Sequence, residues 1–450
     1  MFHLLPLELK NIIFSSLNAS DYMQLISTCK AWRKDLPETW HLSYLRGCRA
    51  ISSIFNEGKN IFITGPGGCG KTFTLDRIKN WAIRRGTRYA CVAPTGIAAY
   101  NINGSTIHSY FPIERKVYPS QRSKMFEKFQ SIDLLIIDEI SMVGCELAGE
   151  IDWILREYRR NNRPFGGIQV VFSGDFFQLP PVKDNMLYGT PLWDSLRLVR
   201  HDFVIPMRQR DDIRFFNLLN RIRCGEITPS DIELLKRRDI ERLDGIPSER
   251  IIYLYFRNED AKGKNLREFN KIPGDVVSVY ADDTVAVKEN HKWREIAVYD
   301  WEEIHKKTNN YTHKFQQMVH LKVQALYYLT TNIDVQKGLV NGTLCTLELI
   351  ENNRLGVRYK EGFTWIYRVQ KEFLFNDGTK KLIRYQYPLI LGYALTVHSS
   401  QGCTFDRIVF DISRVTNRAL LYVGLSRVKR EKDLYLVNVN EDTIRKVLKK

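Results

Sequence analysis

Short apolar runs alternate with amphipathic segments through the first half of the chain. The runs occupy residues 60–64, 88–93, 132–138 and 169–174. Nearly continuous apolar strands are typical of a sheet covered on both faces, and their alternation with helices implies parallel strands joined by right-handed crossovers. Between the last two runs, residues 147–158 have the apolar spacing of a helix. We therefore expect an α/β domain whose functional groups gather where the strands end.

The second half of the chain predicts a second, discontinuous α/β domain. Its elements are expected at residues 213–222, 250–256, 323–329 and from 387 onward. Within it, residues 343–386 contain short β-prone runs separated by Glu351-Asn-Asn and Asn376-Asp-Gly. This pattern predicts the hairpins of a small β-barrel. Residues 275–318 contain no motif that we can interpret and are expected to form an insertion.

The first forty residues have a different pattern. The opening Leu4-Leu-Pro-Leu-Glu-Leu is followed by apolar residues at three- and four-residue spacing, which predicts short helices. With its Leu-Pro start, Cys29-Lys-x-Trp and Trp40, this segment resembles an F-box. The resemblance implies binding to an SKP-type adaptor of cullin ubiquitin ligases. The alternative is a helical cap packed on the rest of the protein.

Composition limits the class of protein. At 450 residues and 44% hydrophobic content, the chain can bury two or three cores. Its net charge of +16 is spread along the sequence and favours a polyanionic partner, with ordinary basicity for solubility as the alternative. The eight cysteines form no C-x-x-C pair, so we expect reduced thiols and no zinc site.

The same sequence gives no sign of a membrane segment. No apolar run approaches the ~20 residues that span a bilayer. Glu8 and Lys10 interrupt the apolar stretch where a secretion signal would lie. We expect an intracellular protein that makes no membrane contact.

A phosphate-binding loop is the strongest local signal. An apolar run ends in Gly65-x-x-x-x-Gly70-Lys71-Thr72, and a segment of helical spacing follows. Glycines, here Gly65, Gly67, Gly68 and Gly70, let backbone N–H groups surround phosphate oxygens at the start of a helix. Lys71 is expected to reach the β and γ phosphates, and Thr72 to hold Mg²⁺. The alternative is a glycine-rich turn with an unrelated lysine.

Two further strand ends carry candidate catalytic groups. Asp138 and Glu139 close a buried run, where Asp138 suits the magnesium shell and Glu139 suits activation of the attacking water. Gln178 lies in a turn stiffened by paired prolines and is placed to sense the γ phosphate. The alternatives are two acids that merely mark a strand end and a loop glutamine satisfied by backbone.

An ordered set of motifs resembles those of the Pif-type DNA helicases, a superfamily-one group related to RecD. The motifs lie at residues 65–72, 93–99 with 104–108, 138–142, 165–181, 207–209, 339–342, 395–402 and 422–427. The resemblance implies two RecA-like domains, ATP and Mg²⁺ as cofactors, and 5′-to-3′ translocation on single-stranded DNA with unwinding of duplexes and forks. It also implies that Arg208 and Arg427 act as arginine fingers on the γ phosphate, and that Gln401 approaches the phosphates. Surface ion pairs are the alternative for both arginines.

The resemblance also assigns DNA contacts to both domains. The residues are Pro94, Thr95, Gly96, Thr106 and His108 on the first, and Thr396, His398 and Ser399 on the second. Small hydroxyl and backbone donors suit phosphate contacts that carry no sequence information. Three aromatic residues are candidates for base stacking, with the protein core as the alternative: Tyr110, Phe111 and Trp365.

Three positions depart from the family pattern. Cys48 stands where a glutamine usually contacts adenine, Ser399 where a lysine is common, and Leu420 where a glutamine often occurs. Because the phosphate, metal, water-activating and finger residues are all present, we expect weaker nucleotide or DNA contacts and an active enzyme.

These patterns together predict five segments and two functional hypotheses. The segments are an F-box-like unit at 1–42, a first RecA-like domain at 45–198, the first part of a second at 199–342, the β-barrel at 343–386 and the rest of the second at 387–450. We expect an ATP-driven DNA helicase, monomeric, acting in replication, recombination or repair. The competing hypothesis is an F-box adaptor that uses a motor fold as a DNA-binding platform, and an RNA motor is excluded only by the resemblance.

Overall fold

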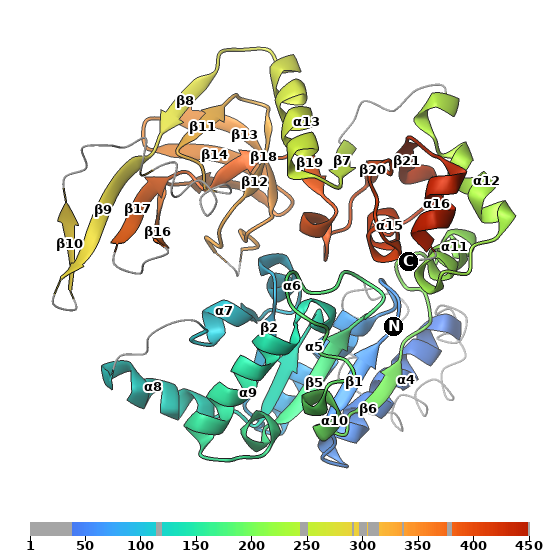
Figure 1. Ribbon diagram of the computed structural model, residues 1–450, viewed down its shortest axis with the longest axis vertical. Helices are drawn as coiled ribbons and strands as arrows, with labels where there is room; N and C mark the ends of the chain where they lie inside the picture. The colour runs from blue at the N-terminus through green and yellow to red at the C-terminus, as the bar shows by residue number, and fades with distance from the viewer. Residues whose placement is uncertain are drawn as a thin grey trace, which may run out of the picture. The chain divides into compact units, whose positions relative to one another are not determined.

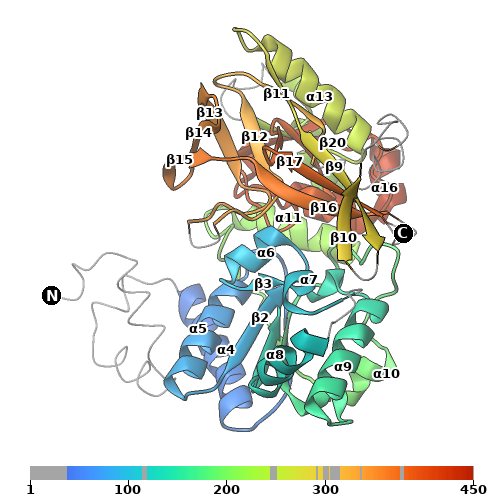
Figure 2. The same cartoon turned by 90° about the vertical axis from the view of Figure 1, so that its left-hand side faces the viewer.

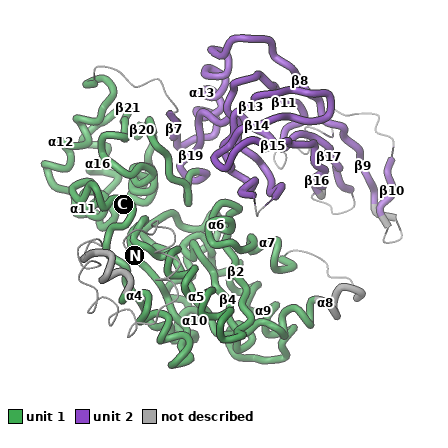
Figure 3. The backbone as a smooth tube through the Cα atoms, turned by 180° about the vertical axis from the view of Figure 1, so that it is seen from behind, with its two compact units in different colours: residues 1–247, 400–450 green, residues 248–399 purple. Residues whose placement is uncertain are grey.

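The computed structural model describes residues 38–113, 119–243, 251–289, 292–296, 304, 315–334, 337–375 and 380–448. The chain divides into two compact units, residues 1–247 with 400–450 and residues 248–399 (Figure 3). The F-box-like segment lies outside the described residues as far as residue 37. In the described part of the chain, no helix combines the length and the apolar character needed to cross a membrane.

A six-stranded parallel sheet forms the centre of the first unit, in the order β3-β2-β4-β5-β1-β6 (Figure 1). Its strands are β1 (Ile61–Thr64), β2 (Tyr89–Ala93), β3 (Ser105–Thr106), β4 (Leu134–Ile137), β5 (Gln169–Gly174) and β6 (Val199–Asp202). The four strands predicted from the apolar runs are all present, which confirms the α/β expectation. The order places β4, β5 and β1 side by side.

Helices cover both faces of this sheet, seen in Figure 2 with α4 and α5 on one side and α9 and α10 on the other. The helices are α4 (Glu38–Phe55), α5 (Lys71–Arg84), α6 (Gly96–Asn101), α7 (Ile107–Tyr110), α8 (Pro119–Gln130), α9 (Cys145–Arg159) and α10 (Pro191–Ser195). Alternate residues of one strand point to opposite faces, so Ile61 and Ile63 pack toward α4 and α5, whereas Phe62 packs toward the other side.

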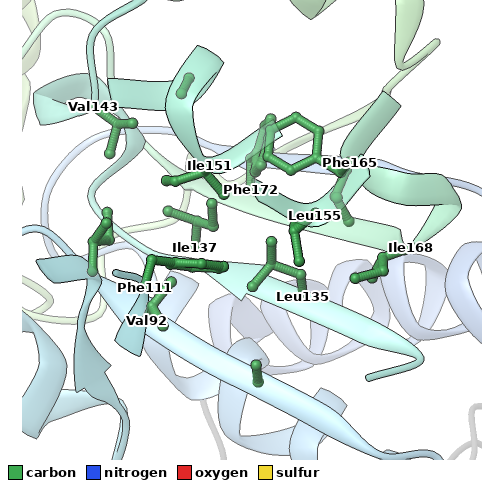
Figure 4. Packing of buried hydrophobic residues seen from close by; sticks show 14 of the residues in the cluster. Val92, Phe111, Leu135, Ile137, Val143, Ile151, Leu155, Phe165, Ile168 and Phe172 are labelled. Atoms are coloured by element: carbon green, nitrogen blue, oxygen red, sulfur yellow. The ribbon is translucent and has the colours of Figure 1, made fainter. Parts of the chain in front are cut away.

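Close packing of large side chains stabilises the α9 face (Figure 4). Phe172 is fully buried, with ring centroids of Phe165 and Trp193 each 5.8 Å away. Phe111 is also buried and stacks on Phe129 at 5.5 Å. Each such side chain contributes roughly 1.5–3 kcal/mol through burial. Phe111 is therefore a core residue, which was the alternative to base stacking at this position.

The remainder of the first unit contains a second group of elements. They are α11 (Ile213–Cys224), α12 (Pro229–Arg237), β20 (Arg407–Asp411), α15 (Arg418–Leu425), β21 (Leu434–Val437) and α16 (Glu441–Leu448), with short 3₁₀ turns at Ile240–Arg242 and Glu431–Asp433. Two further 3₁₀ turns, Ile140–Met142 and Pro164–Gly167, lie between β4 and β5. Strands β20 and β21 pair in parallel, and helix α11 packs against α15. A capping box between Thr228 and Asp231 begins α12.

The second unit is mainly antiparallel. Its elements are β7 (Ile251–Tyr255), α13 (Asn258–Lys271), β8 (Val277–Tyr280), β9 (Asp282–Glu289), β10 (Lys292–Ile296), β11 (Met318–Leu321), β12 (Leu326–Leu329), β13 (Leu344–Glu351), β14 (Arg354–Tyr359), β15 (Gly362–Ile366), β16 (Val369–Leu374), β17 (Lys380–Gln386), β18 (Leu389–Leu391) and β19 (Ala394–Thr396), with a 3₁₀ turn at His398–Ser400 where the two units meet in sequence. Strands β19 and β7 pair in parallel. The antiparallel sheets have the orders β15-β14-β13-β12-β18 and β10-β9-β17-β16, and β11 pairs with β8.

Two expectations for this unit change. We expected residues 323–329 in the second parallel sheet, but β12 pairs antiparallel with β13 and β18. A four-residue apolar strand shows which face is buried and not which strand it joins, so the sequence could not settle this pairing. Part of the uninterpreted insertion forms β8, β9 and β10, and β9 pairs with β17. Hairpins occur where the β-barrel was expected, and closure into a barrel stays a prediction.

Candidate active site

Three adjacent strands end at the predicted catalytic residues. The phosphate-loop pattern follows β1, Asp138 and Glu139 follow β4, and Gln178 lies four residues after β5. Because β4, β5 and β1 are neighbours in a parallel sheet, their carboxyl ends share one edge. The structure thus brings together the loop, the acids and the glutamine that the sequence predicted separately.

Glycines at 65 and 68 meet conformational and steric demands that no other residue satisfies. Gly65 has φ +137°, and a Cβ atom there would lie 1.9 Å from the carbonyl oxygen of Phe203. Gly68 has φ +81°, and a Cβ atom there would lie 2.5 Å from Cβ of Arg208. The loop can therefore approach residues 203–208 only as glycine.

Lys71 begins helix α5 and lies folded over the loop. Its Nζ donates to the carbonyl oxygens of Gly65, at 2.6 Å, and Pro66, at 2.9 Å. Within the described residues Lys71 has no carboxylate partner in an ion pair. Thr72 is exposed at the same helix end. The ammonium group is thus held at the loop by two carbonyl oxygens and not by an ion pair.

The paired acids occupy an environment that opposes ionisation. Asp138 is buried, and Glu139 has φ +50°, in the left-handed region. Burial raises the pKa of Asp138 above its ordinary value, and burial followed by the charge of Asp138 raises the pKa of Glu139. Lys71 lowers both pKa values, so these groups lie within electrostatic reach of one another. A carboxylate with a raised pKa is suited to accept a proton near neutral pH.

Gln178 is buried at the end of a tight turn. Its backbone N–H donates to the carbonyl oxygen of Asp175 at 2.8 Å. Its Nε2 atom lies 4.0 Å from the position that a Cβ atom on Gly67 would occupy. The glutamine amide therefore lies at the phosphate loop, where its predicted sensing role requires it to be.

Arg208 lies directly against the phosphate loop. The backbone N–H groups of Met207 and Arg208 donate to the carbonyl oxygen of Gly68, at 2.9 and 3.0 Å. Its guanidinium makes one long contact, 3.5 Å from Nη1 to the carbonyl oxygen of Ser426. Desolvation lowers its pKa, and no described carboxylate forms an ion pair with it. Most of its five N–H donors thus remain available.

Arg427 is buried and more constrained. Its Nε donates to the carbonyl of Val423, Nη1 to the carbonyls of Ser400 and Cys403, and Nη2 to Oγ of Ser426. Burial, followed by the charge of Arg208, lowers its pKa to about 10, which leaves it cationic at neutral pH. It has no ion-pair partner among the described residues. The two predicted arginine fingers therefore differ in how many guanidinium N–H donors are unused, and Arg427 has only one.

The side-chain amide of Gln401 is buried and unpaired within the described part of the chain. Its side chain is 3% exposed, and neither Oε1 nor Nε2 has a hydrogen-bond partner among the described residues. Leaving a buried amide unpaired costs about 1–3 kcal/mol per group, so such groups are expected to meet a ligand or water. The orphaned amide, the cations that form no ion pair among the described residues and the glycine loop all fit a bound nucleotide.

Three residues at this site escaped the sequence analysis. The Tyr422 hydroxyl accepts the N–H of Gly67 at 2.9 Å, and Asp175 forms a buried ion pair with Arg223. Asp175 and Tyr422 lie inside motifs that we had identified, so motif membership could have singled them out. Nothing in the local pattern distinguishes Arg223 from the other arginines of α11.

The predicted DNA residues of the first unit lie at the same edge of the sheet as the catalytic groups, but at the ends of β2 and β3. Pro94, Thr95 and Gly96 follow β2, while Thr106 ends β3 and His108 is exposed in α7. The Thr95 hydroxyl accepts the N–H of Ala98 and caps helix α6. These residues are close to one another because Ala93 pairs with Thr106 in the sheet.

The predicted DNA residues of the second unit repeat one of these turns. Thr106 accepts the N–H of Ser109, and Thr396 accepts the N–H of Ser399, each at 3.3 Å. The sequences are Thr-Ile-His-Ser and Thr-Val-His-Ser, and the histidine is exposed in both, at His108 and His398. Ser399, which replaces the usual lysine, is thus part of a capped turn.

The structure also places Cys48, at the aligned adenine position, and Trp365, a candidate for base stacking. Cys48, at the aligned position of the adenine-reading glutamine, is buried and lies 3.0 Å from Nη2 of Arg77. Trp365 is partly buried in β15, with the guanidinium of Arg354 4.0 Å from its ring centre. Cys48 therefore sits in the core of α4 and α5, and one face of Trp365 is already covered.

Comparison with known proteins agrees with this geometry. The family model described as PIF1-like helicase matches residues 48–231, and the F-box domain model matches residues 2–37. ATP-dependent DNA helicase PIF1 of Danio rerio is 32% identical over 420 residues, covering 88% of this chain and 62% of that protein. The chain therefore spans less than two thirds of the length of this relative.

Solved structures give the same result. The crystal structure of Pif1 helicase from Candida albicans has a TM-score of 0.74 and 29% identity, covering 90% of this chain and 97% of that one. Pif1 helicase from Bacteroides in complex with ADP-AlF3 and single-stranded DNA has a TM-score of 0.70 and 25% identity, covering 88% and 93%. The resemblance seen in the motifs is confirmed. The chain therefore carries a PIF1-like helicase match at residues 48–231 and an F-box match at residues 2–37, and it is similar to Pif1 helicases over most of its length.

Proposed function

We propose that this protein is an ATP-hydrolysing helicase that moves 5′ to 3′ on single-stranded DNA and unwinds duplex and forked DNA. The observation that carries the proposal is that Lys71 and Arg208 lie at one glycine loop, with Arg427 within electrostatic reach of Arg208, and that no carboxylate among the described residues forms an ion pair with any of the three. Arg427 is buried, Lys71 and Arg208 are partly buried, and positive charge that is withdrawn from water in this way favours an anionic partner. A nucleoside triphosphate supplies one.

The residues of the loop bind and orient the triphosphate. Backbone N–H groups of residues 67–72 and the Lys71 ammonium donate to phosphate oxygens, and the buried Gln401 amide gains the partners that it lacks. Thr72 and Asp138 would hold Mg²⁺, which neutralises phosphate charge when bound. The hydroxyl and carboxylate are the hard oxygen ligands that this ion prefers.

The remaining groups act on the reaction itself. Glu139 accepts a proton from the attacking water, which its raised pKa favours. Arg208 and Arg427 donate to the oxygens that carry the developing charge, an effect typically worth roughly 10³–10⁵ in rate. Gln178, at the loop, distinguishes the triphosphate from the diphosphate.

Hydrolysis is useful to a motor only if it alters the grip on DNA. Thr95, Thr106 and His108 in the first unit, and Thr396 and His398 in the second, present polar groups in capped turns that suit phosphate contacts. We expect a monomer acting on DNA in the nucleus or at a viral replication site. Binding that depends on phosphate contacts weakens steeply as salt rises.

Hydrolysis stimulated by single-stranded DNA tests this proposal. Lys71→Ala is expected to lower the stimulated rate by roughly 10²–10³, the usual cost of one preorganised donor. The matched control is Lys59→Ala, which removes an exposed lysine just before β1 and is expected to keep the wild-type rate. Undiminished hydrolysis in Lys71→Ala contradicts the site.

A second function is favoured by the F-box match at residues 2–37. We propose that this segment recruits the SKP-type adaptor of a cullin ubiquitin ligase. The full chain is expected to capture the purified adaptor. Deletion of residues 1–37, which leaves α4 intact, is expected to abolish this capture. Equal capture by the shortened chain contradicts the adaptor role and leaves the motor unaffected.

A further inference from the structure

A buried ion pair connects the turn that carries Gln178 to helix α11. Arg223 of α11 donates to Asp175 through Nε, at 2.9 and 3.2 Å, and through Nη2, at 2.8 Å. The Asp175 side chain is fully buried and that of Arg223 is 11% exposed. Two parallel N–H···O bonds fix the relative orientation of the groups as well as their distance.

Asp175 in turn organises the residues up to Gln178. Its carboxylate accepts the N–H of Phe177 at 3.2 Å, and its carbonyl accepts the N–H of Gln178 at 2.8 Å. The ring centre of Phe177 lies 4.3 Å from the guanidinium carbon of Arg223 and 5.7 Å from that of Arg418 in α15. The whole turn is therefore held against α11 and α15 through charged and aromatic contacts.

The opposite end of α11 begins next to Arg208. Asp212 caps this helix by accepting the N–H of Phe215 and also accepts the N–H of Glu431, at 3.0 and 2.9 Å. Three residues separate Arg208 from Asp212, and α11 runs without interruption from Ile213 to Cys224. Rigid secondary elements are among the features that carry coupling between sites. Helix α11 connects the turn of Asp175 at one end to the residues that follow Arg208 at the other.

Stability alone does not account for this pair. An ion pair in a protein interior is often no more stabilising than apolar residues of similar size, because both charges lose their hydration. Such a pair does fix one geometry, and here that geometry joins the turn of Gln178 to the helix that follows Arg208. The role that fits is positional.

We propose that Arg223 is a positioning residue for ATP hydrolysis. By holding Asp175, it fixes the turn of Gln178 on α11, so that occupancy of the phosphate site and the placement of Arg208 depend on each other. This inference rests on the proposed ATPase function. It predicts that Arg223 affects turnover and leaves nucleotide binding nearly unchanged, because Arg223 bonds to Asp175 and not to the loop.

Helix α11 offers a matched control. Arg221 forms its own ion pair with the buried Asp231 of α12, at 2.5 Å, and has no bond to the turn of Asp175. Arg223→Gln and Arg221→Gln each break one ion pair of the same helix. Both are expected to lower the melting temperature, so a purely structural role predicts parallel effects on activity.

The test compares three quantities in the full chain: the DNA-stimulated kcat, the Kd of a fluorescent ADP, and the melting temperature. Arg223→Gln is expected to lower kcat at least about tenfold, since small misplacements of reacting groups cost up to roughly 10² in rate. Its Kd is expected to change less than threefold. Arg221→Gln is expected to keep kcat within twofold of the wild type.

Each outcome decides between the alternatives. Wild-type kcat in folded Arg223→Gln overturns the inference, as does a loss of kcat that matches Arg221→Gln. If Arg223→Gln does not fold, Arg223→Lys keeps the charge and loses the paired bonds, and its kcat then decides by the same criterion. If the wild-type protein does not hydrolyse ATP, the result contradicts the proposed ATPase function and not the role of Arg223.

Discussion

Tyr422 controls access to one donor of the phosphate loop, and removing its hydroxyl should strengthen nucleotide binding. The hydroxyl accepts the N–H of Gly67 at 2.9 Å, and the tyrosine is 2% exposed. Burial raises the pKa of Tyr422, so the group stays a neutral phenol at working pH. A charged phosphate oxygen is the stronger acceptor for the same N–H. We therefore expect phosphate to displace the hydroxyl.

The magnitude follows from one hydrogen bond. Such a bond contributes about 0.5–1.5 kcal/mol net, which the nucleotide-free protein loses in Tyr422→Phe. The bound state loses nothing if the hydroxyl has already left. A change of about 1.4 kcal/mol in binding free energy changes Kd tenfold. A loss of about 1 kcal/mol from the nucleotide-free state therefore lowers the Kd of ATP and of ADP about fivefold.

Isothermal titration of the variant with ADP measures this directly. Tyr158→Phe is the control, because its hydroxyl makes only a 3.8 Å contact with Sδ of Met125, on α8, and should leave Kd unchanged. A Kd in Tyr422→Phe that equals or exceeds the wild-type value refutes the reasoning. It would mean that the hydroxyl stays in place, or contacts the nucleotide itself.

Two further predictions concern the loop and the core. Cys69 is 1% exposed, and burial raises the pKa of its thiol to about 11. Alkylation of Cys69 by iodoacetamide requires the thiolate, so it should be slow at pH 8 and should accelerate as pH approaches 11. Rapid labelling of Cys69 at pH 8 in the folded protein contradicts this, with the partly exposed Cys145 as internal reference. Phe172→Ala should lower the free energy of unfolding, measured by urea titration, by about 3–5 kcal/mol, because Phe172 is fully buried between Phe165 and Trp193. A loss below about 1 kcal/mol would show that the core closes over the cavity.

The parts of the site that could be predicted from the sequence are those encoded locally. Gly65, Lys71 and Thr72 occur within eight residues, and Asp138 and Glu139 directly follow an apolar strand, so spacing and strand ends sufficed. Their convergence on one edge followed from the parallel topology.

Contacts between distant segments could not be predicted in this way. The bond between Gly67 and Tyr422 joins residues 355 positions apart, and the choice of Arg223 rather than Arg221 as the partner of Asp175 depends on the rotation of α11. The pairing of β12 was missed because strand patterning specifies faces and not partners. For Phe111 the sequence left base stacking and the core as alternatives, and its burial decides for the core.

The central claim is that ATP hydrolysis at the loop of Lys71 drives movement along DNA in one direction. The most direct measurement compares unwinding of a duplex with a 5′ single-stranded tail and the same duplex with a 3′ tail, each with ATP and Mg²⁺, for the wild type and Lys71→Ala. We predict that the wild type unwinds the 5′-tailed duplex alone, and that Lys71→Ala unwinds neither. Unwinding of the 3′-tailed duplex, or equal unwinding by Lys71→Ala, would contradict the account.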